Sequence, residues 1–377
     1  MVVERDAQCR MRDGTILRSD LYRPDEDGSY PVLLIRGPYD KRVGLSSFGN
    51  SHPAWFAEHG YIVIIQDTRG RFASEGEFYP FAYEAEDGFD SVEWAARVTG
   101  SDGQVGMFGF SYLGATQLLA ATTRPPSLKA IVPGFTASQY FDGWTYNSGA
   151  FALGFNCYWA NLLAMDTAAR NQNISDLEEL SLSLGSASNW FWSTPLKNYP
   201  PLKSKSADYF FDWLAHPTYD EYWRRWSIDE DYSRIDVPAL HIAGWYDIFL
   251  SGSVNNFCGI SRDGGSANTR NHQKLLIGPW THMPWSPVGN TGKTEPSTSE
   301  IDDWTIRWFD EILKNKNTGI LDSPITIYPV NGNLLELEKW HTGESPTETW
   351  FFHSEGRANS KFGDGKLDKY SPADEHV

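Results

Sequence analysis

The sequence is poor in cysteine and in basic residues. Its three cysteines, Cys9, Cys157 and Cys258, lie far apart and form no Cys-x-x-Cys or Cys/His cluster. This excludes a disulfide framework or a zinc ribbon and fits a reducing compartment. Lys and Arg number 32 against 49 Asp and Glu, a net charge of −17. Such an excess of negative charge argues against nucleic acid or an anionic membrane as a partner.

Long apolar runs are also missing. The longest are residues 31–35 and 61–65, far short of a membrane span. Residues 1–6 lack the apolar core of a signal peptide. We therefore expect a cytoplasmic protein, and 377 residues are enough for two or three folded units.

Aromatic residues are abundant, at 15% of the chain with 16 Trp. Many belong in a core, but such a supply also suits a pocket for flat or apolar ligands. No motif for a metal or cofactor accompanies them, and we expect neither. Four acids of one expected helix, over residues 84–98, are interpreted as a solvated face and not as a metal site: Glu84, Glu86, Asp87 and Asp90.

The order of expected elements divides the chain into four parts. Over residues 1–135 and 236–318, short buried strands alternate with helices, which predicts an open, mostly parallel sheet with ligands at its carboxyl edge. Over 136–235 aromatic helical segments replace the strands, so we expect a helical cap, or simply an extra helical layer. Strand-like pieces over 319–377 predict the start of a β domain.

Ser111 lies between an apolar strand at 105–108 and a helix-forming run at 115–121. Glycines at 109 and 114 flank it, which is typical of a nucleophile elbow, a strained turn that exposes a serine hydroxyl. The usual pattern is G-x-S-x-G, and here the second glycine comes one residue late. Glycine-rich turns with serine also occur in proteins without nucleophilic chemistry, so partners are needed.

Asp247 and His282 each follow a buried strand, and with Ser111 they stand in the chain order Ser, Asp, His. Acyl transfer needs a base for the serine proton and a carboxylate to orient that base. Taken singly, each is more often a turn or structural residue, but the three together favour catalysis. His241, by contrast, falls inside a strand.

An oxyanion would also need donors. The backbone N–H of Tyr112 directly follows the nucleophile, and Tyr39 lies in the loop after an early strand. A tyrosine in such a loop can equally be a packing residue.

Five motifs then follow one another along the chain: RGPYDK at 36–41, QDTRGR at 66–71, GFSYLG at 109–114, GWYD at 244–247 and GPWTH at 278–282. In this order they resemble the bacterial cocaine-esterase-like (CocE/NonD) hydrolases, a family grouped with the X-prolyl dipeptidyl-peptidases. The resemblance runs from near the N-terminus to the end of the chain. It also accounts for the late glycine, because G-x-S-Y-x-G is that family's own elbow.

The resemblance implies an α/β-hydrolase domain with a helical cap and a C-terminal jelly-roll β domain. Ser111 would be the nucleophile, His282 the general base and then acid, and Asp247 its orienting partner. The phenol of Tyr39 and the amide of Tyr112 would form the oxyanion hole.

By the same resemblance, Trp144, Trp159 and Phe249 would line an aromatic acyl pocket, although the two tryptophans can equally be cap core. Asp67 and Arg69 are interpreted as a structural carboxylate–guanidinium pair.

The family's β domain is normally much longer than the segment after residue 321 in this chain. About fifty residues cannot close a jelly roll, so we expect this domain to be incomplete: a truncated product, a fragment or a divergent short form.

The first hypothesis is a serine hydrolase that cleaves carboxylic esters, with a small-molecule ester or a short peptide-like substrate and a homodimer possible. Its rival is an X-prolyl dipeptidyl-peptidase, or an α-amino-acid ester hydrolase or amidase, which needs a carboxylate for the substrate amine. The cap offers four acids for that purpose: Asp142, Asp166, Asp212 and Asp220. A hypothesis of another class is a non-catalytic binding protein on the same scaffold.

Overall fold

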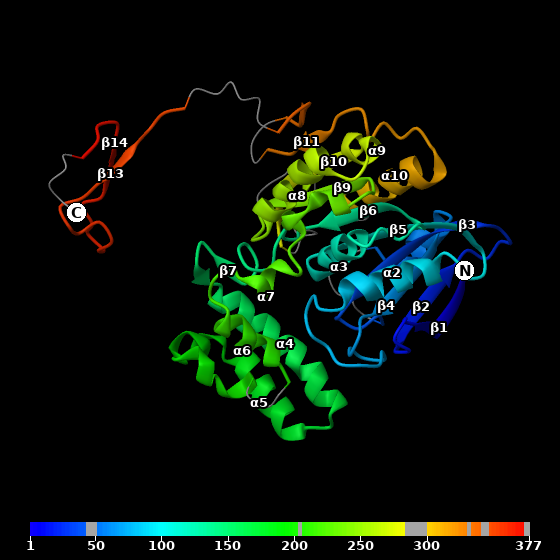
Figure 1. The fold of residues 1–377 in the computed structure, drawn as a ribbon, viewed down its shortest axis with the longest axis horizontal. Coiled ribbons are helices and arrows are strands. Elements are labelled where there is room, and N and C mark those ends of the chain that lie inside the picture. Colours follow the sequence, from blue (N-terminus) through cyan, green and yellow to red (C-terminus); the bar gives the residue numbers. More distant parts are fainter. Residues whose placement is uncertain (43–50, 203–205, 283–299, 330–332, 341–346, 373–377) are drawn as a thin grey trace. The chain divides into compact units, whose positions relative to one another are not determined.

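The computed structural model describes residues 1–42, 51–202, 206–282, 300–329, 333–340 and 347–372 (Figure 1). The chain divides into two compact units, Met1–Glu338 and Lys339–Val377. All the site residues named above lie in the first unit.

The first unit is built on one sheet, which has ten strands in the described residues, in the order β1-β2-β4-β3-β5-β6-β9-β10-β11-β12. Neighbours from β4 to β11 pair in parallel, whereas β1, β2 and β12 run antiparallel to their neighbours. The strands are β1 (Val2–Arg10), β2 (Ile16–Arg23), β3 (Tyr30–Gly37), β4 (Ile62–Asp67), β5 (Ser101–Phe110), β6 (Leu128–Gly134), β9 (Ala239–Tyr246), β10 (Gln273–Thr281), β11 (Ile325–Ile327) and β12 (Leu335–Leu337).

Helices cover both faces of this sheet, which is why its central strands are apolar throughout. In β3, Val32 and Leu34 belong to the core beneath α2 and α3, while Leu33 and Ile35 face the core beneath α1 and α10. The helices that pack on the sheet are α1 (Pro53–Glu58), α2 (Glu84–Ala95), α3 (Tyr112–Ala121), α8 (Leu250–Asp263) and α10 (Glu300–Lys314), and the short α9 (Ala267–Asn271) packs on α8. The predicted α/β architecture is confirmed.

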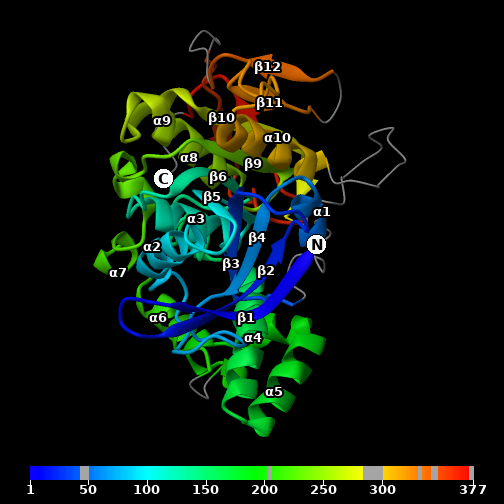
Figure 2. The same ribbon diagram turned by 90° about the vertical axis from the view of Figure 1, so that its right-hand side faces the viewer.

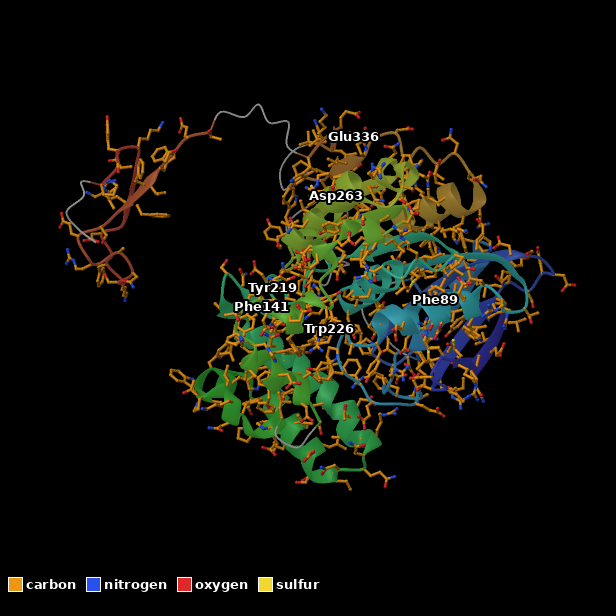
Figure 3. The ribbon with its side chains drawn as sticks, viewed as in Figure 1. Phe89, Phe141, Tyr219, Trp226, Asp263 and Glu336 are labelled. Atoms are coloured by element: carbon orange, nitrogen blue, oxygen red, sulfur yellow. The ribbon has the colours of Figure 1, made fainter. Side chains whose placement is uncertain are left out.

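A helical layer separates β6 from β9 in the sequence, within the range predicted for the cap. Figures 1 and 2 show its longer helices gathered at one end of the unit, away from the sheet. It comprises the hairpin β7 (Tyr146–Asn147) and β8 (Ala150–Phe151), and the helices α4 (Leu153–Arg170), α5 (Ile174–Gly185), η2 (Ala187–Trp192), η3 (Leu196–Asn198), η4 (Pro200–Leu202), α6 (Asp208–Ala215), α7 (Glu221–Arg224), η5 (Ile228–Glu230) and η6 (Tyr232–Arg234). Aromatic side chains form its interior. Phe141 and Tyr219, for example, have ring centroids 6.0 Å apart where β7 approaches α7 (Figure 3).

The β domain was expected to begin at residue 319. The sheet of the first unit nevertheless continues through β11 and β12, and that unit ends at Glu338. The second unit contributes an antiparallel hairpin of β13 (Phe351–His353) and β14 (Lys366–Asp368).

The interpretation of the α2 acids as a solvated face is wrong for two of the four. Glu84 and Asp87 are buried, whereas Glu86 is exposed. Glu84 pairs with Arg36 over 2.9 Å, and Asp87 pairs with Arg69 over 2.6 Å. A buried carboxylate is tolerated in such a position because a guanidinium compensates it.

The expected pair between Asp67 and Arg69 is also wrong. Arg69 binds Asp87 and Asp13 instead, and Asp67 accepts the backbone N–H groups of Lys41 and Ala73. Both residues still hold the loop after β4, but with partners elsewhere in the chain.

Two kinds of feature are absent from the described residues. No group of three or more His, Cys, Asp or Glu there could hold a metal ion. Among the helices described, none combines the length and apolarity that a membrane span requires.

Candidate active site

Ser111 sits in the turn between β5 and α3 with φ 60° and ψ −125°. A positive φ is uncommon for a residue other than glycine and costs on the order of 1–3 kcal/mol. Hydrogen bonds on both sides hold it there. Its N–H donates to the Gly134 carbonyl over 2.9 Å, and its own carbonyl accepts from Gly114 and Ala115. The strand–turn–helix geometry is that of a nucleophile elbow.

Gly109 has φ +135°, a conformation that L side chains rarely adopt. A Cβ there would also lie 2.6 Å from the Cβ of Leu113. Leu113 therefore packs over Gly109, and the close approach of α3 to the end of β5 depends on this glycine.

The three predicted triad residues come together at the carboxyl edge of the sheet. His282 Nε2 lies 2.9 Å from Ser111 Oγ, and His282 Nδ1 lies 2.8 Å from Asp247 Oδ1. Because an ionised carboxylate only accepts, the Nδ1–H donates to Asp247, which leaves the Nε2 lone pair facing the serine hydroxyl. Asp247 follows β9 and His282 follows β10, two neighbouring parallel strands. Parallel pairing thus places their ends side by side.

Tyr39 lies in the loop after β3, and its phenol hydrogen-bonds with Ser111. It also accepts the indole N–H of Trp159 over 3.0 Å. Burial raises the pKa of Tyr39 to about 12, although both hydrogen bonds and the charge of Arg71 act to lower it. The phenol therefore stays protonated, as a hydrogen-bond donor must.

Tyr112 offers its backbone and not its side chain to this site. As the first residue of α3 it has no intrahelical acceptor for its N–H. Its phenol points into the core, where it donates to Glu84 Oε1 and accepts the N–H of Phe81, both over 2.9 Å.

The three residues predicted for the acyl pocket form one aromatic cluster beside the triad. Trp144 stacks on Phe249 with centroids 4.4 Å apart, and Phe249 meets the ring of His282 edge-on at 5.1 Å. Trp159 lies 5.4 Å from Trp144. Phe155, which contacts both Trp159 and Phe249, was missed. Its spacing of four residues from Trp159, one helical turn, could have indicated it.

The four cap acids considered as anchors for a substrate amine all have partners within the protein. Asp166 accepts the N–H of Phe72, and Asp212 accepts the phenol of Tyr79. Asp142 accepts the N–H of Ser148, and Asp220 lies 2.7 Å from His216 and also caps α7. None of the four contacts Ser111 in any hydrogen bond found among the described residues.

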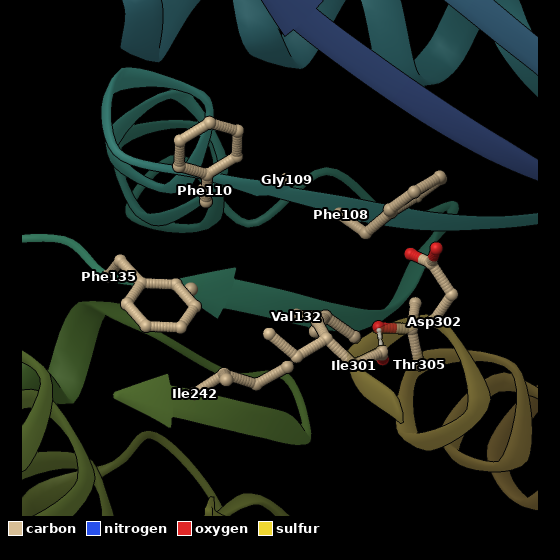
Figure 4. A pocket seen from close by; sticks show the side chains of 10 residues that line it. Phe108, Gly109, Phe110, Val132, Phe135, Ile242, Ile301, Asp302 and Thr305 are labelled. Carbon is tan, nitrogen blue, oxygen red and sulfur yellow. Dashed lines mark hydrogen bonds between the residues drawn. The ribbon is translucent and has the colours of Figure 1, made fainter. Parts of the chain in front are cut away.

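A cavity of about 20 Å³ lies between the sheet and α10, lined by side chains of β5, β6, β9 and α10 (Figure 4). Its walls include Phe110, Phe135, Ile242 and Asp302. That volume holds about one water, so it is a packing void and not a site for an acyl group.

The fold and this site together define an α/β hydrolase. Residues 13–284 match the family model described as X-Pro dipeptidyl-peptidase (S15 family). The chain therefore belongs to this family, and its resemblance to CocE/NonD hydrolases is confirmed.

Individual relatives agree with that membership. The chain is 33% identical to the cocaine esterase of Rhodococcus sp. (strain MB1 Bresler) over 97% of its own length and 65% of that protein. A CocE/NonD family hydrolase from Staphylococcus aureus shares the fold with a TM-score of 0.67 at 22% identity, over 93% of this chain and 57% of that one. An α-amino acid ester hydrolase shares the fold with a TM-score of 0.68 at 22% identity, over 100% of this chain and 64% of that one. The chain thus spans less than two thirds of each of these relatives.

Proposed function

We propose that this chain is a serine hydrolase that cleaves carboxylic esters through an acyl-enzyme. The observation that carries the proposal is the continuous hydrogen-bonded series Ser111–His282–Asp247, which begins at the strained turn residue Ser111. The cocaine esterase relationship supports it independently.

In the proposed reaction, Ser111 Oγ attacks the ester carbonyl carbon while His282 Nε2 takes the hydroxyl proton. Asp247 holds the imidazole in the required tautomer and stabilises its positive charge. The carbonyl oxygen becomes an oxyanion, which the Tyr39 phenol and the Tyr112 N–H bind.

Collapse of this intermediate breaks the bond to the alcohol oxygen, which leaves with the proton held by His282. Water then attacks the acyl-enzyme with His282 again as base. The second collapse releases the acid and returns the proton to Ser111. These side chains supply the nucleophile, the base and the oxyanion donors, so the mechanism calls for no cofactor.

The surroundings of the triad favour an apolar, aromatic acyl group. Phe249 meets the ring of His282 edge-on, and Trp144 and Trp159 extend this aromatic cluster beyond Phe249. An amine-directed peptidase needs a carboxylate near the nucleophile, and the four cap acids are each engaged elsewhere.

Labelling with a fluorophosphonate probe tests the mechanism. We expect stoichiometric labelling of the chain and none of Ser111→Ala, with both proteins shown to be folded by circular dichroism. Absence of label on the unmutated, folded chain would instead support a non-catalytic binding protein.

The family's X-Pro dipeptidyl-peptidase description keeps one second candidate open. A p-nitrophenyl benzoate and an X-Pro anilide, compared by kcat/KM, distinguish the two. We expect a preference for the ester, and a strong preference for the anilide would contradict the esterase proposal.

A further inference from the structure

We propose that Trp159, on cap helix α4, is a positioning residue that directs the phenol proton of Tyr39 toward the reacting carbonyl oxygen. This inference rests on the proposed function, because it concerns how the oxyanion donor is oriented. It gives Trp159 a role in the chemistry beyond that of an acyl-pocket wall.

The direction of the hydrogen bond carries the first step. An indole N–H can only donate, so in the 3.0 Å contact the phenol oxygen of Tyr39 must accept. Tyr39 has one O–H, and that proton cannot point back at Trp159. Ser111, at the reacting centre, is among the hydrogen-bond partners of the phenol. Trp159 thereby selects the rotamer of the phenol hydrogen that an oxyanion requires.

The rigidity of the indole carries the second step. Trp159 is buried and stacks nearly parallel on Phe155 and on Trp213, with interplanar angles of 12° and 4°. A ring packed on both sides in this way cannot readily change its orientation. The N–H is therefore a fixed point toward which the phenol oxygen is drawn.

The same face of α4 also holds the loop that bears Tyr39. One turn beyond Trp159, the Leu163 carbonyl accepts from Arg71 Nη1 over 2.8 Å. The Nε of Arg71 donates to the carbonyl of Pro38, the residue before Tyr39, over 3.2 Å. A further turn along, Asp166 accepts the N–H of Phe72. The cap helix thus fixes the phenol through Trp159 and its backbone through Arg71.

Electrostatics act in the same direction as geometry. Arg71 is buried beside Tyr39, and its positive charge lowers the pKa of the phenol, as does the hydrogen bond from Trp159. Arg71 and Trp159 thus offset part of the rise in pKa that burial causes, and the same positive charge and N–H favour negative charge next to the phenol oxygen. Burial alone would give a weaker donor.

The test uses Trp159→Phe, which keeps an apolar ring but removes the N–H. We expect kcat for a p-nitrophenyl ester to fall by about tenfold or more, against the 10²–10³ typical for loss of an oxyanion donor in Tyr39→Phe. KM should change by less than about threefold, because substrate contacts are largely kept. A residue that only walls the pocket would raise KM instead.

A double-mutant cycle decides whether Trp159 acts through Tyr39. In the Tyr39→Phe background, Trp159→Phe should cause no further loss of kcat, because the phenol that it orients is gone. Losses that multiply in the double variant would overturn the proposal.

Trp308→Phe is the matched control, since Trp308 is a buried tryptophan of α10 whose Nε1 has no hydrogen-bond partner in the described residues. We expect it to leave kcat unchanged. If Trp159→Phe does not fold, replacement of Trp159 by the isosteric 3-benzothienylalanine removes the N–H and keeps the bicyclic shape. Full activity of that folded isostere would overturn the role of Trp159.

Fluorophosphonate labelling separates this inference from the proposed function. Failure to label the unmodified chain would count against both. Normal labelling and turnover with multiplicative losses would remove only the role given to Trp159.

Discussion

Gly114 faces Thr136 across a gap that has no room for a methyl group. A Cβ at Gly114 would lie 2.8 Å from the Cβ of Thr136 and 2.9 Å from the carbonyl oxygen of Gly134. The first turn of α3 thus passes directly over the end of β6. This contact explains why the second glycine of the elbow comes one residue later than in G-x-S-x-G: the residue that meets β6 is at 114.

Gly114→Ala should therefore destabilise the protein by about 1–3 kcal/mol, the usual cost of overpacking. The three nearest atoms to that Cβ belong to the Gly134 backbone or to the β-branched side chain of Thr136, neither of which can move aside easily. The shift of the urea midpoint measures the loss. Gly185→Ala is the control, because Gly185 ends α5 with nothing within 4 Å of a Cβ. An equal loss in both variants would contradict the steric explanation.

Two tyrosines at the site should respond differently to the same substitution. Tyr39→Phe removes a proposed oxyanion donor and should lower kcat by about 10²–10³. Tyr112→Phe leaves the backbone N–H in place, so kcat should fall less than about tenfold. It should instead cost about 1–3 kcal/mol of stability, because Glu84 and the N–H of Phe81 each lose a buried partner.

Steady-state kinetics and urea unfolding of the Tyr39→Phe and Tyr112→Phe variants measure these two effects.

Because burial raises the pKa of Tyr39 to about 12, its phenol should remain a donor at pH 10. The ratio of kcat between the unmutated chain and Tyr39→Phe should hold from pH 8 to 10. A ratio that falls toward one by pH 10 would show that the phenol ionises earlier.

The positions of the site residues could be predicted because each follows a recognisable local pattern. Ser111, Asp247 and His282 come directly after buried strands, and parallel strands bring their ends to one edge. The bond from Trp159 to Tyr39 could not be predicted. It joins residues 120 apart, and no spacing rule in sequence links a cap helix to the loop after β3.

The same limit applies to the fold. Alternating buried runs predicted the parallel sheet. The ion pairs between residues distant in the sequence were not predicted. Arg69 was assigned to its neighbour Asp67, and its partner Asp87 was placed on a solvated helix face. Acids on one helix look alike in sequence, and only packing decides which is buried. Likewise β11 carries the apolar pattern of any short strand, and its partner β10 lies some fifty residues earlier.

Replacing each of two acids of α2 by alanine should therefore lower the free energy of unfolding by very different amounts. Asp87→Ala leaves Arg69 nearly buried without its main partner and should cost about 3–5 kcal/mol. Asp90→Ala breaks a pair with Arg12, whose side chain is 49% exposed, and should cost less, at about 1 kcal/mol. Urea unfolding of the two variants measures the difference. Similar losses would mean that burial of the Arg69–Asp87 pair is not what sets its strength.

His241 should make stability depend on pH. It is buried within β9, its Nε2 lies 2.9 Å from Gln273 Oε1, and the ring of Phe257 packs edge-on against it. Burial lowers the pKa of His241 from 6.5 to about 4, so the unfolded chain binds a proton at a higher pH than the folded one does. The stability that this imidazole contributes is thus complete above pH 6.5 and is lost as the pH falls toward 4.

The expected slope is up to about 1.4 kcal/mol per pH unit between those limits. Urea unfolding at several pH values, for the unmutated chain and for His241→Asn, isolates the contribution, because every other titrating group is common to both. Asn cannot titrate, so the variant should lose stability less steeply on acidification, whatever its stability at pH 7. Parallel curves would show that the imidazole is protonated, or solvated, in the folded chain. The Nε2–H would still donate to Gln273 Oε1 in that case, and the added proton would lie on Nδ1, which is buried without a hydrogen-bond partner among the described residues.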